Sequence, residues 1–494
     1  MKLFDLRNPA HLSALSISTF AVVSMAGCGG HGTPPPITPQ GNTTVTILLS
    51  STANDRLTQY QLGFQSLTLT SQSGKTVSLL TAPSSGASPY TPEFMHLNGV
   101  SSTLLTATVP EDTYTSASLT AGGASITCIA VNQSDGSLTT SIFAYGQTPP
   151  SQVTVNLPSP IVVTGGTMSL SMQLDGAKSY TLAACPGGSP SDTYSITPTF
   201  NLTAADLSSS PSNYLNGKET NVLGQVNAVS STGFSVALGY SYASTLPQVT
   251  QSITANSSTA YQGVSGLTAL TQGTFVDLDL AAQSDGSLLA TRVAVHDPAA
   301  VDVVSGPVAQ VASAVPAIFS YGQQVQGPDQ LGNTAPFDLS KATFSISQQY
   351  SNLANLPFTP NFEGSNLVPG QNVYITTPAS TVTGFNRYPL ANTMTLMPQT
   401  VDGVVTATDS SGDFDVYTIT LASYDLIPAL AGQQGATNLI STPQQIVVYA
   451  DGNASLASTA EPAIGGTYRF HGLVFNDAGT LRMDCDQVDT GITQ

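Results

Sequence analysis

The residue types that could carry out chemistry are few and widely separated in this chain. Five histidines occur in 494 residues, and three of them follow the first 40 residues: His96, His296 and His471. No His-Glu-x-x-His, Cys-x-x-Cys or Gly-x-Ser-x-Gly pattern is present. We expect these histidines to lie in different domains. The sequence therefore predicts no catalytic residue, no metal site and no bound cofactor.

The closest approach to a catalytic pair is formed by two aspartates. Asp277 and Asp279 are two residues apart, so on a strand they share one face, while Val276, Leu278 and Leu280 fill the other. Paired catalytic carboxylates would instead be expected on different elements that face a cleft. The pattern is that of a half-solvated strand, and we expect both acids to be exposed to water.

A second acidic group, Asp409, Asp413 and Asp415, offers oxygen ligands at close spacing, as calcium loops do. The later bidentate Glu of such loops is missing. A hairpin turn between strands at Val404–Ala407 and Phe414–Thr420 accounts for the same residues, and we favour it. We expect the acids of this chain to cluster at turns, where water keeps them ionised.

Aromatic side chains could form a stacking platform for sugars. The candidates are Tyr240, Tyr242, Tyr261 and Tyr374, although tyrosines of β-proteins are more usually half-buried strand residues. The chain contains no Trp, which weakens the case for a sugar-binding module.

The composition indicates a β-protein of three to four domains. Charged residues make up 8% of the chain, against about 25% in ordinary soluble domains. The 43 Gly and 32 Pro favour short strands joined by turns. The formal net charge is −18 and no basic run occurs, so we expect no nucleic-acid partner. Anionic lipid headgroups would also repel this surface.

The N-terminus has the features of an export signal. Lys2 and Arg7 precede an apolar run over Leu12–Ser24, which ends in Met25-Ala26-Gly27-Cys28. This ending resembles the lipobox of bacterial lipoproteins. The resemblance implies that residues 1–27 are removed, that Cys28 carries a diacylglyceryl group, and that its new amino terminus is acylated. Several acyl chains would anchor the protein stably to a membrane.

The residues that follow predict a tether and a location. Residues 28–43 are rich in Gly and Pro and should lift the folded part off the membrane. Gly29 and Gly30 replace the Asp that retains some lipoproteins in the inner membrane. We therefore favour the outer membrane or the cell surface.

Three cysteines remain once Cys28 is assigned to the lipid. An oxidising compartment permits one disulfide among them. Cys128 and Cys185 lie in one predicted domain and are the expected pair. We expect Cys485 to be a buried, poorly reactive thiol.

Residues 44–200 predict an antiparallel β-sandwich. Short alternating segments recur, among them Tyr114–Leu119 and Ser125–Val131, with Gly122-Gly123 between them. The first strand and the run over Leu157–Ser179 resemble an uncharacterised N-terminal domain of bacterial surface lipoproteins. Residues 201–218 read as a linker with at most one helical turn.

The remainder contains an internal repeat. Val222-x-Gly224-x-Val226 recurs as Val304-x-Gly306-x-Val308 and Val401-x-Gly403-x-Val405. A later glycine opens an alternating strand in each copy: Gly273, Gly370 and Gly465. We predict three small β-modules, 219–300, 301–400 and 401–494, either OB-type barrels or sandwiches. Through Gly273–Leu280 and Asp285–Val293 the repeats resemble a second uncharacterised family, found as tandem arrays in secreted and lipid-anchored bacterial proteins.

These features favour a lipid-anchored, non-enzymatic protein of the cell envelope with a structural, adhesive or partner-presenting role. Its membrane contact would be the N-terminal lipid, and the sequence does not identify a protein or glycan partner. We expect the sandwich to carry the three modules outward as a stalk. The alternative is a surface protein that binds polysaccharide or calcium, with a surface hydrolase third.

Overall fold

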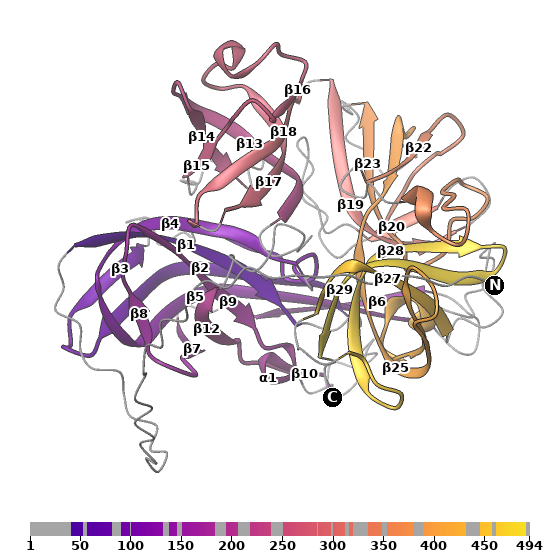
Figure 1. The fold of residues 1–494 in the computed structure, drawn as a ribbon, viewed down its shortest axis with the longest axis horizontal. Coiled ribbons are helices and arrows are strands. Elements are labelled where there is room, and N and C mark those ends of the chain that lie inside the picture. The colour runs from indigo at the N-terminus through magenta and orange to yellow at the C-terminus, as the bar shows by residue number, and fades with distance from the viewer. Residues whose placement is uncertain are drawn as a thin grey trace, which may run out of the picture. The chain divides into compact units, whose positions relative to one another are not determined.

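The computed structural model describes most of the chain beyond residue 40. The described residues are 41–52, 57–81, 90–98, 100–131, 138–145, 151–182, 194–205, 218–238, 250–283, 285–297, 300–311, 316–319, 334–347, 353–378, 389–430, 445–456 and 461–490. They form strands almost throughout, as predicted (Figure 1). Among these residues no helix is long and apolar enough to cross a membrane.

The N-terminal domain contains ten paired strands that form the two layers of a sandwich. One layer has the order β4 (Ser102–Pro110), β1 (Asn42–Ser51), β9 (Thr167–Leu174), β12 (Thr199–Ala205) and β7 (Ser151–Asn156). The other contains β3 (Thr76–Leu80), β2 (Leu57–Ser71), β5 (Asp112–Val131), β6 (Leu138–Tyr145) and β8 (Ile161–Val163). The β5–β7 pairing joins the layers, and β1–β9 and β7–β12 are parallel. After β9 come the short helix α1 (Gly176–Ser179) and the pair β10 (Tyr180–Leu182) and β11 (Tyr194–Ile196).

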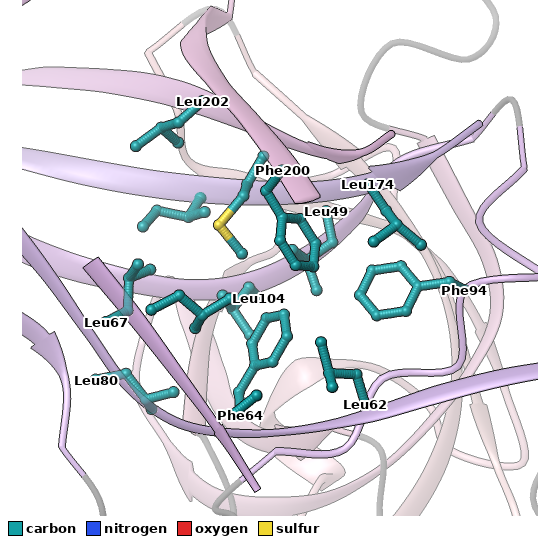
Figure 2. Close-up of a cluster of buried hydrophobic side chains, with 14 of the residues drawn as sticks. Leu49, Leu62, Phe64, Leu67, Leu80, Phe94, Leu104, Leu174, Phe200 and Leu202 are labelled. Carbon is teal, nitrogen blue, oxygen red and sulfur yellow. The ribbon is translucent and has the colours of Figure 1, made fainter. Parts of the chain in front are cut away.

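An aromatic cluster fills the space between the layers (Figure 2). Phe64 of β2, Phe200 of β12 and Phe94 of the connection before β4 are fully buried. Their ring centroids lie 5.6–6.1 Å apart. Leucines from both layers surround the rings, as the alternation of apolar residues predicts.

Three details of the sandwich differ from the sequence-based expectation, and the first is that the β1–β9 and β7–β12 pairs are parallel in a sandwich expected to be antiparallel. Tyr114–Leu119 and Ser125–Val131 belong to one 20-residue strand, β5, and are not separate strands. Gly122 and Gly123 lie inside it, where the register against β2 shifts around Phe64. A bulge absorbs the glycines without ending the strand. The last strand, β12, extends to Ala205, so residues 201–205 belong to the sandwich and not to a linker.

Each repeat has its own sheet. The first contains β13 (Lys218–Val229), β14 (Gly233–Leu238), β15 (Thr250–Thr254), β16 (Ala260–Gln262), β17 (Phe275–Ala282) and β18 (Leu288–Val295). The second contains β19 (Val301–Gln310), β20 (Ala317–Phe319), β21 (Thr334–Pro336), β22 (Thr343–Ile346), β23 (Asn372–Pro378) and β24 (Thr393–Leu396). The third contains β25 (Gln399–Asp409), β26 (Asp415–Leu421), β27 (Gln445–Leu456), β28 (Thr467–Asp477) and β29 (Thr480–Thr490). Short helices η1 (Leu267–Ala269), η2 (Leu353–Asn355) and α2 (Leu426–Ala429) connect some of these strands.

The strand order resolves the choice between barrel and sandwich. In the third module the strands close as β25-β26-β27-β29-β28, with β27 and β29 parallel. The first module closes its equivalent strands in the same way through the parallel β15–β18 pair. This is the Greek-key arrangement of an OB-type barrel. In the described part of the second module the same order remains open, and β22 pairs with β24.

The two sequence landmarks of each repeat bind one another. The N–H of Gly273 donates to the carbonyl of Val226 at 2.8 Å, and Gly370–Val308 and Gly465–Val405 make the same bond at the same distance. The valine N–H in turn donates to the carbonyl of the residue after the glycine, at 2.8–3.0 Å. All three glycines have φ between +84° and +93°, a conformation that disfavours other residues. The three copies of the sequence repeat therefore occupy equivalent positions in the three modules.

The third module contacts both the sandwich and the second module. The Thr400 hydroxyl of the third barrel donates to the Asn98 carbonyl of the sandwich at 2.8 Å, in a buried contact. Gln371 Nε2 of the second module donates to the Val474 carbonyl of the third at 2.9 Å. Leu473 and Phe475 of β28 also belong to the apolar core of the second module. A string in which only successive modules touch does not include the Thr400–Asn98 bond between the third module and the sandwich, and in this respect the structure differs from the expected arrangement.

The repeat allows a matched test of these glycines. A Cβ at Gly370 would lie 2.5 Å from Ile427 Cγ1 and 2.9 Å from Ile427 N, whereas a Cβ at Gly273 or Gly465 would meet nothing within 4 Å. We expect Gly273→Ala and Gly465→Ala to lower the unfolding free energy by about 1 kcal/mol through backbone strain. Gly370→Ala should cost about 1–3 kcal/mol more through overpacking. Denaturant unfolding of the three variants checks this, and equal losses would contradict it.

Candidate functional site

The strongest concentration of ionisable groups lies on β17 and β18 of the first barrel. Val276 and Leu278 fill the barrel core, as predicted, so Asp277 and Asp279 point outward. Arg292 lies opposite Asp279 in the register of β18. Its Nε donates to Asp279 Oδ2 at 2.8 Å, and its Nη2 lies 3.0 Å from Asp279 Oδ1 and 2.9 Å from Asp277 Oδ1. One guanidinium therefore holds two carboxylates.

Both aspartates were expected to be exposed, and this is wrong. The side chains of Asp277, Asp279 and Arg292 are only 14%, 11% and 15% exposed. The second module covers them, because the Tyr374 hydroxyl of β23 donates to Asp277 Oδ2 at 3.2 Å. Burial raises the pKa of Asp277, although Arg292 opposes the shift. Burial also raises the pKa of Tyr374 well above its usual value, which keeps the hydroxyl a donor.

The same contact removes Tyr374 from the possible sugar platform. Its residue exposure is 7%, and it packs with Val303 and Met397 beside the first module. Tyr261 lies on the short edge strand β16 and is half-buried, while Tyr240 and Tyr242 are outside the described residues. The described tyrosines therefore do not assemble into an exposed row.

A second buried carboxylate joins the sandwich to the first barrel. Glu219 of β13 accepts hydrogen bonds from the Thr103 N–H at 2.6 Å and from the Ser102 hydroxyl at 3.1 Å. Burial raises the pKa of Glu219, and these hydrogen bonds and nearby His96 oppose the shift. Gln251 of β15 adds a further bond, from Nε2 to the Leu104 carbonyl at 2.8 Å.

Glu93 orders the sandwich loop that carries His96. Its carboxylate accepts from the backbone N–H groups of Tyr60, Met95 and His96 at 2.8–3.1 Å. His96 Nδ1 lies 3.1 Å from Glu93 Oε2. Ser102, His96 and Glu93 are residues of the types that form a hydrolase triad. Ser102, however, donates to the Glu219 carboxylate, so its hydroxyl serves the junction.

The third barrel contains a further polar group on its outer face. Asp402 and Arg469 are opposite one another on β25 and β28, with Oδ1 and Nε 3.4 Å apart, and both are almost fully buried. Burial raises the pKa of Asp402, and Arg469 opposes the shift. On β28 and β29, His471 Nδ1 lies 3.0 Å from Asp486 Oδ1. Beside it, burial and the charges of Asp486 and Asp451 raise the pKa of Asp484 to about 7.

The expectation that acids cluster at turns in water is therefore only partly correct. Asp409 is the last residue of β25 and does lie at the predicted hairpin turn, where the Ser411 N–H donates to it at 3.0 Å. Others are less than a tenth exposed: Glu93, Asp112, Glu219, Asp279, Asp302, Asp402, Asp425 and Asp486. Strand alternation placed several of these acids off the core face, but neighbouring modules and loops then covered that second face.

The three histidines lie in different parts of the fold, as predicted. His96 contacts Glu93 in the sandwich, and His471 contacts Asp486 in the third barrel. His296 follows β18, and burial lowers its pKa. Within the described residues, no group of three or more His, Cys, Asp or Glu side chains is arranged to hold a metal ion.

The cysteine assignments are only partly described. Cys485 is free and buried, and burial raises its pKa well above the usual value, which agrees with a poorly reactive thiol. Cys128 is buried in the sandwich core and is disulfide-bonded. Cys185 and the lipidation residue Cys28 lie outside the described residues. The Cys128–Cys185 pairing therefore stays a prediction.

A search against protein families finds no match, and a search of curated proteins finds none. The resemblances to a lipoprotein signal and to two uncharacterised domain families remain predictions.

The Arg292 network predicts a large penalty for losing its cation. Arg292→Met leaves two covered carboxylates without their counter-ion and should lower the unfolding free energy by about 3–5 kcal/mol. The combined variant Arg292→Met, Asp277→Asn, Asp279→Asn should recover much of this loss, because the buried charge is gone. Equal destabilisation of the single and combined variants in denaturant unfolding would contradict the network.

Asp484 predicts a pH dependence. Its pKa of about 7 in the folded state exceeds the ordinary value of 3.8. Its stabilising contribution is therefore complete below about pH 4 and is lost as pH rises through about 7. Between pH 4 and 8, the wild type should lose up to about 4 kcal/mol more unfolding free energy than Asp484→Asn. Asp409→Asn, in the exposed turn, should keep the wild-type difference, and parallel pH profiles for wild type and Asp484→Asn would refute the assignment.

Proposed function

We propose that this protein is a lipid-anchored, non-enzymatic scaffold of the cell envelope that holds its modules rigidly and presents them to partners. The observation that carries the proposal is the use of the buried junction carboxylates. Glu219 binds the sandwich to the first barrel, and Asp277 binds the first module to the second. Groups that could serve catalysis are thereby engaged in holding one segment of the chain against another.

The lipid anchor is supported by sequence and charge together. The signal-like N-terminus ends at Cys28, in a motif that resembles a lipobox. A net charge of −18 disfavours adsorption to anionic lipid through the protein surface. Attachment through acyl chains does not require the protein surface to bind anionic lipid. The proposed location is the outer membrane or the cell surface.

Lipidation is expected to be decisive for the membrane location. Mass spectrometry of the mature N-terminus should find an acylated Cys28 and no residues 1–27. Cys28→Ala should move the protein out of the membrane fraction, because the acyl chains supply its membrane affinity. Cys485→Ala, which removes a buried free thiol, should leave the membrane fraction unchanged. An intact N-terminus, or a Cys28→Ala protein that stays in the membrane, would contradict the anchor.

The non-enzymatic part has its own test at the sandwich junction. Ser102 and His96 both act on the Glu219 carboxylate, Ser102 through a hydrogen bond and His96 through its charge. Turnover of a generic ester that is lost in Ser102→Ala and in His96→Gln would replace the scaffold role by a hydrolase. A background rate shared by the wild type and both variants supports the scaffold.

A further inference from the structure

The Gly370 end of the second module is a docking surface for a short apolar turn. Val368, Pro369, Gly370 and Gln371 are all buried there. Ile427 of α2 in the third module lies directly against Gly370 and shares an apolar cluster with Val368. The missing side chain of Gly370 admits this contact, since a Cβ would lie within 3.0 Å of the Ile427 backbone.

The third barrel has the same end, and no described residue covers it. The hydrogen bonds between the glycine turn and the first strand make Ala463, Ile464, Gly465 and Gly466 equivalent to Val368–Gln371. A Cβ at Gly465 would meet nothing within 4 Å. Ile464 is 64% exposed and Val404 of the adjacent strand is 39% exposed, the two highest values among the large hydrophobic residues of the described chain.

The first barrel provides the contrast. In the described part of the chain nothing covers its equivalent end either, because a Cβ at Gly273 would meet nothing within 4 Å. The residues that correspond to Val404 and Ile464 are Gln225 and Gln272 there. An uncovered end is therefore polar in the first barrel and apolar in the third. An apolar end matches the chemistry of the covered end in the second module.

We propose that the open end of the third barrel, formed by Val404, Ala463, Ile464 and Gly465, docks a short apolar turn of a partner polypeptide with basic flanking residues. The apolar part of this chemistry comes from α2, whose Leu426 and Ile427 are both buried. Basic flanking residues are proposed for the partner because the third module is negatively charged. Residues 401–494 contain 11 Asp and Glu and 2 Arg, a net charge of 2 − 11 = −9, half of the −18 of the whole chain.

The inference deepens the proposed presenting role and rests on it, but it can be tested without the lipid. The probe is a labelled peptide with the sequence of residues 423–430, extended by two lysines at each end. Fluorescence anisotropy against the full chain in detergent should show saturable binding. Ile464→Asp should weaken binding at least tenfold, and a peptide with Ile427→Asp should lose it. Gln272→Asp, the same repeat position in the first barrel, should bind within twofold of the wild type.

Other outcomes distinguish the alternatives. Lysine flanks should bind more tightly than glutamate flanks at low salt, and this difference should shrink at high salt. Unchanged binding to Ile464→Asp, or no saturation at millimolar peptide, would overturn the docking surface. A dimer in sedimentation that Ile464→Asp abolishes would replace the partner by a second copy of this chain. Cys28→Ala should bind the peptide like the wild type, so a failed lipid anchor and a failed docking surface are distinguishable.

Discussion

The three modules depend on one backbone interaction, a pair of hydrogen bonds that joins a buried valine to a left-handed glycine and to the residue after that glycine. The glycine ends the connection that precedes the fourth barrel strand, and the valine lies on the first strand. Two bonds at this point set the register of the two strands, and a one-residue slip would turn every core side chain outward. The interaction recurs at Gly273, Gly370 and Gly465 with nearly constant geometry. It explains why this short pattern remains visible among diverged sequences.

A fixed register also determines which residues face the neighbouring modules. Four residues after the glycine, the outward position is Asp277 in the first module, Tyr374 in the second and Arg469 in the third. Asp277 and Tyr374 bind one another across a junction, while Arg469 faces Asp402 within its own barrel. The same position in the barrel is therefore acidic in the first module, a tyrosine in the second and basic in the third. The variation distinguishes the modules and allows them to dock in a specific order.

The few charged residues of the chain include several that lie in the junctions between modules. Charged residues make up only 8% of the chain, and four of them, Glu219, Asp277, Asp279 and Arg292, lie in covered junctions. Covering a carboxylate is costly unless donors replace its water, and here Thr103, Ser102, Arg292 and Tyr374 provide them. Breaking such a junction would leave a charge without its partner, so the junctions favour one arrangement of the modules. A rigid arrangement is consistent with the presenting role proposed above.

The sequence by itself determined the all-β class, the three repeats and the core face of the strands. Alternation such as Val276-Asp277-Leu278-Asp279 depends only on the two-residue period of a strand. The landmark glycines were also readable, because a left-handed turn requires a residue without a side chain. Closure of the barrels was decided by the parallel β15–β18 and β27–β29 pairs, which join segments far apart in the sequence.

Only the tertiary structure decided what covers the second face of each strand. Asp277 and Asp279 look like solvated acids in the sequence, since local alternation cannot show that Tyr374, 97 residues later, lies above them. Glu219 and Thr400 likewise acquire their partners Thr103 and Asn98 only through packing of distant segments. The physical reason is the range of the interactions. Strand periodicity is a property of neighbouring residues, whereas burial of a polar group depends on every element that packs against it.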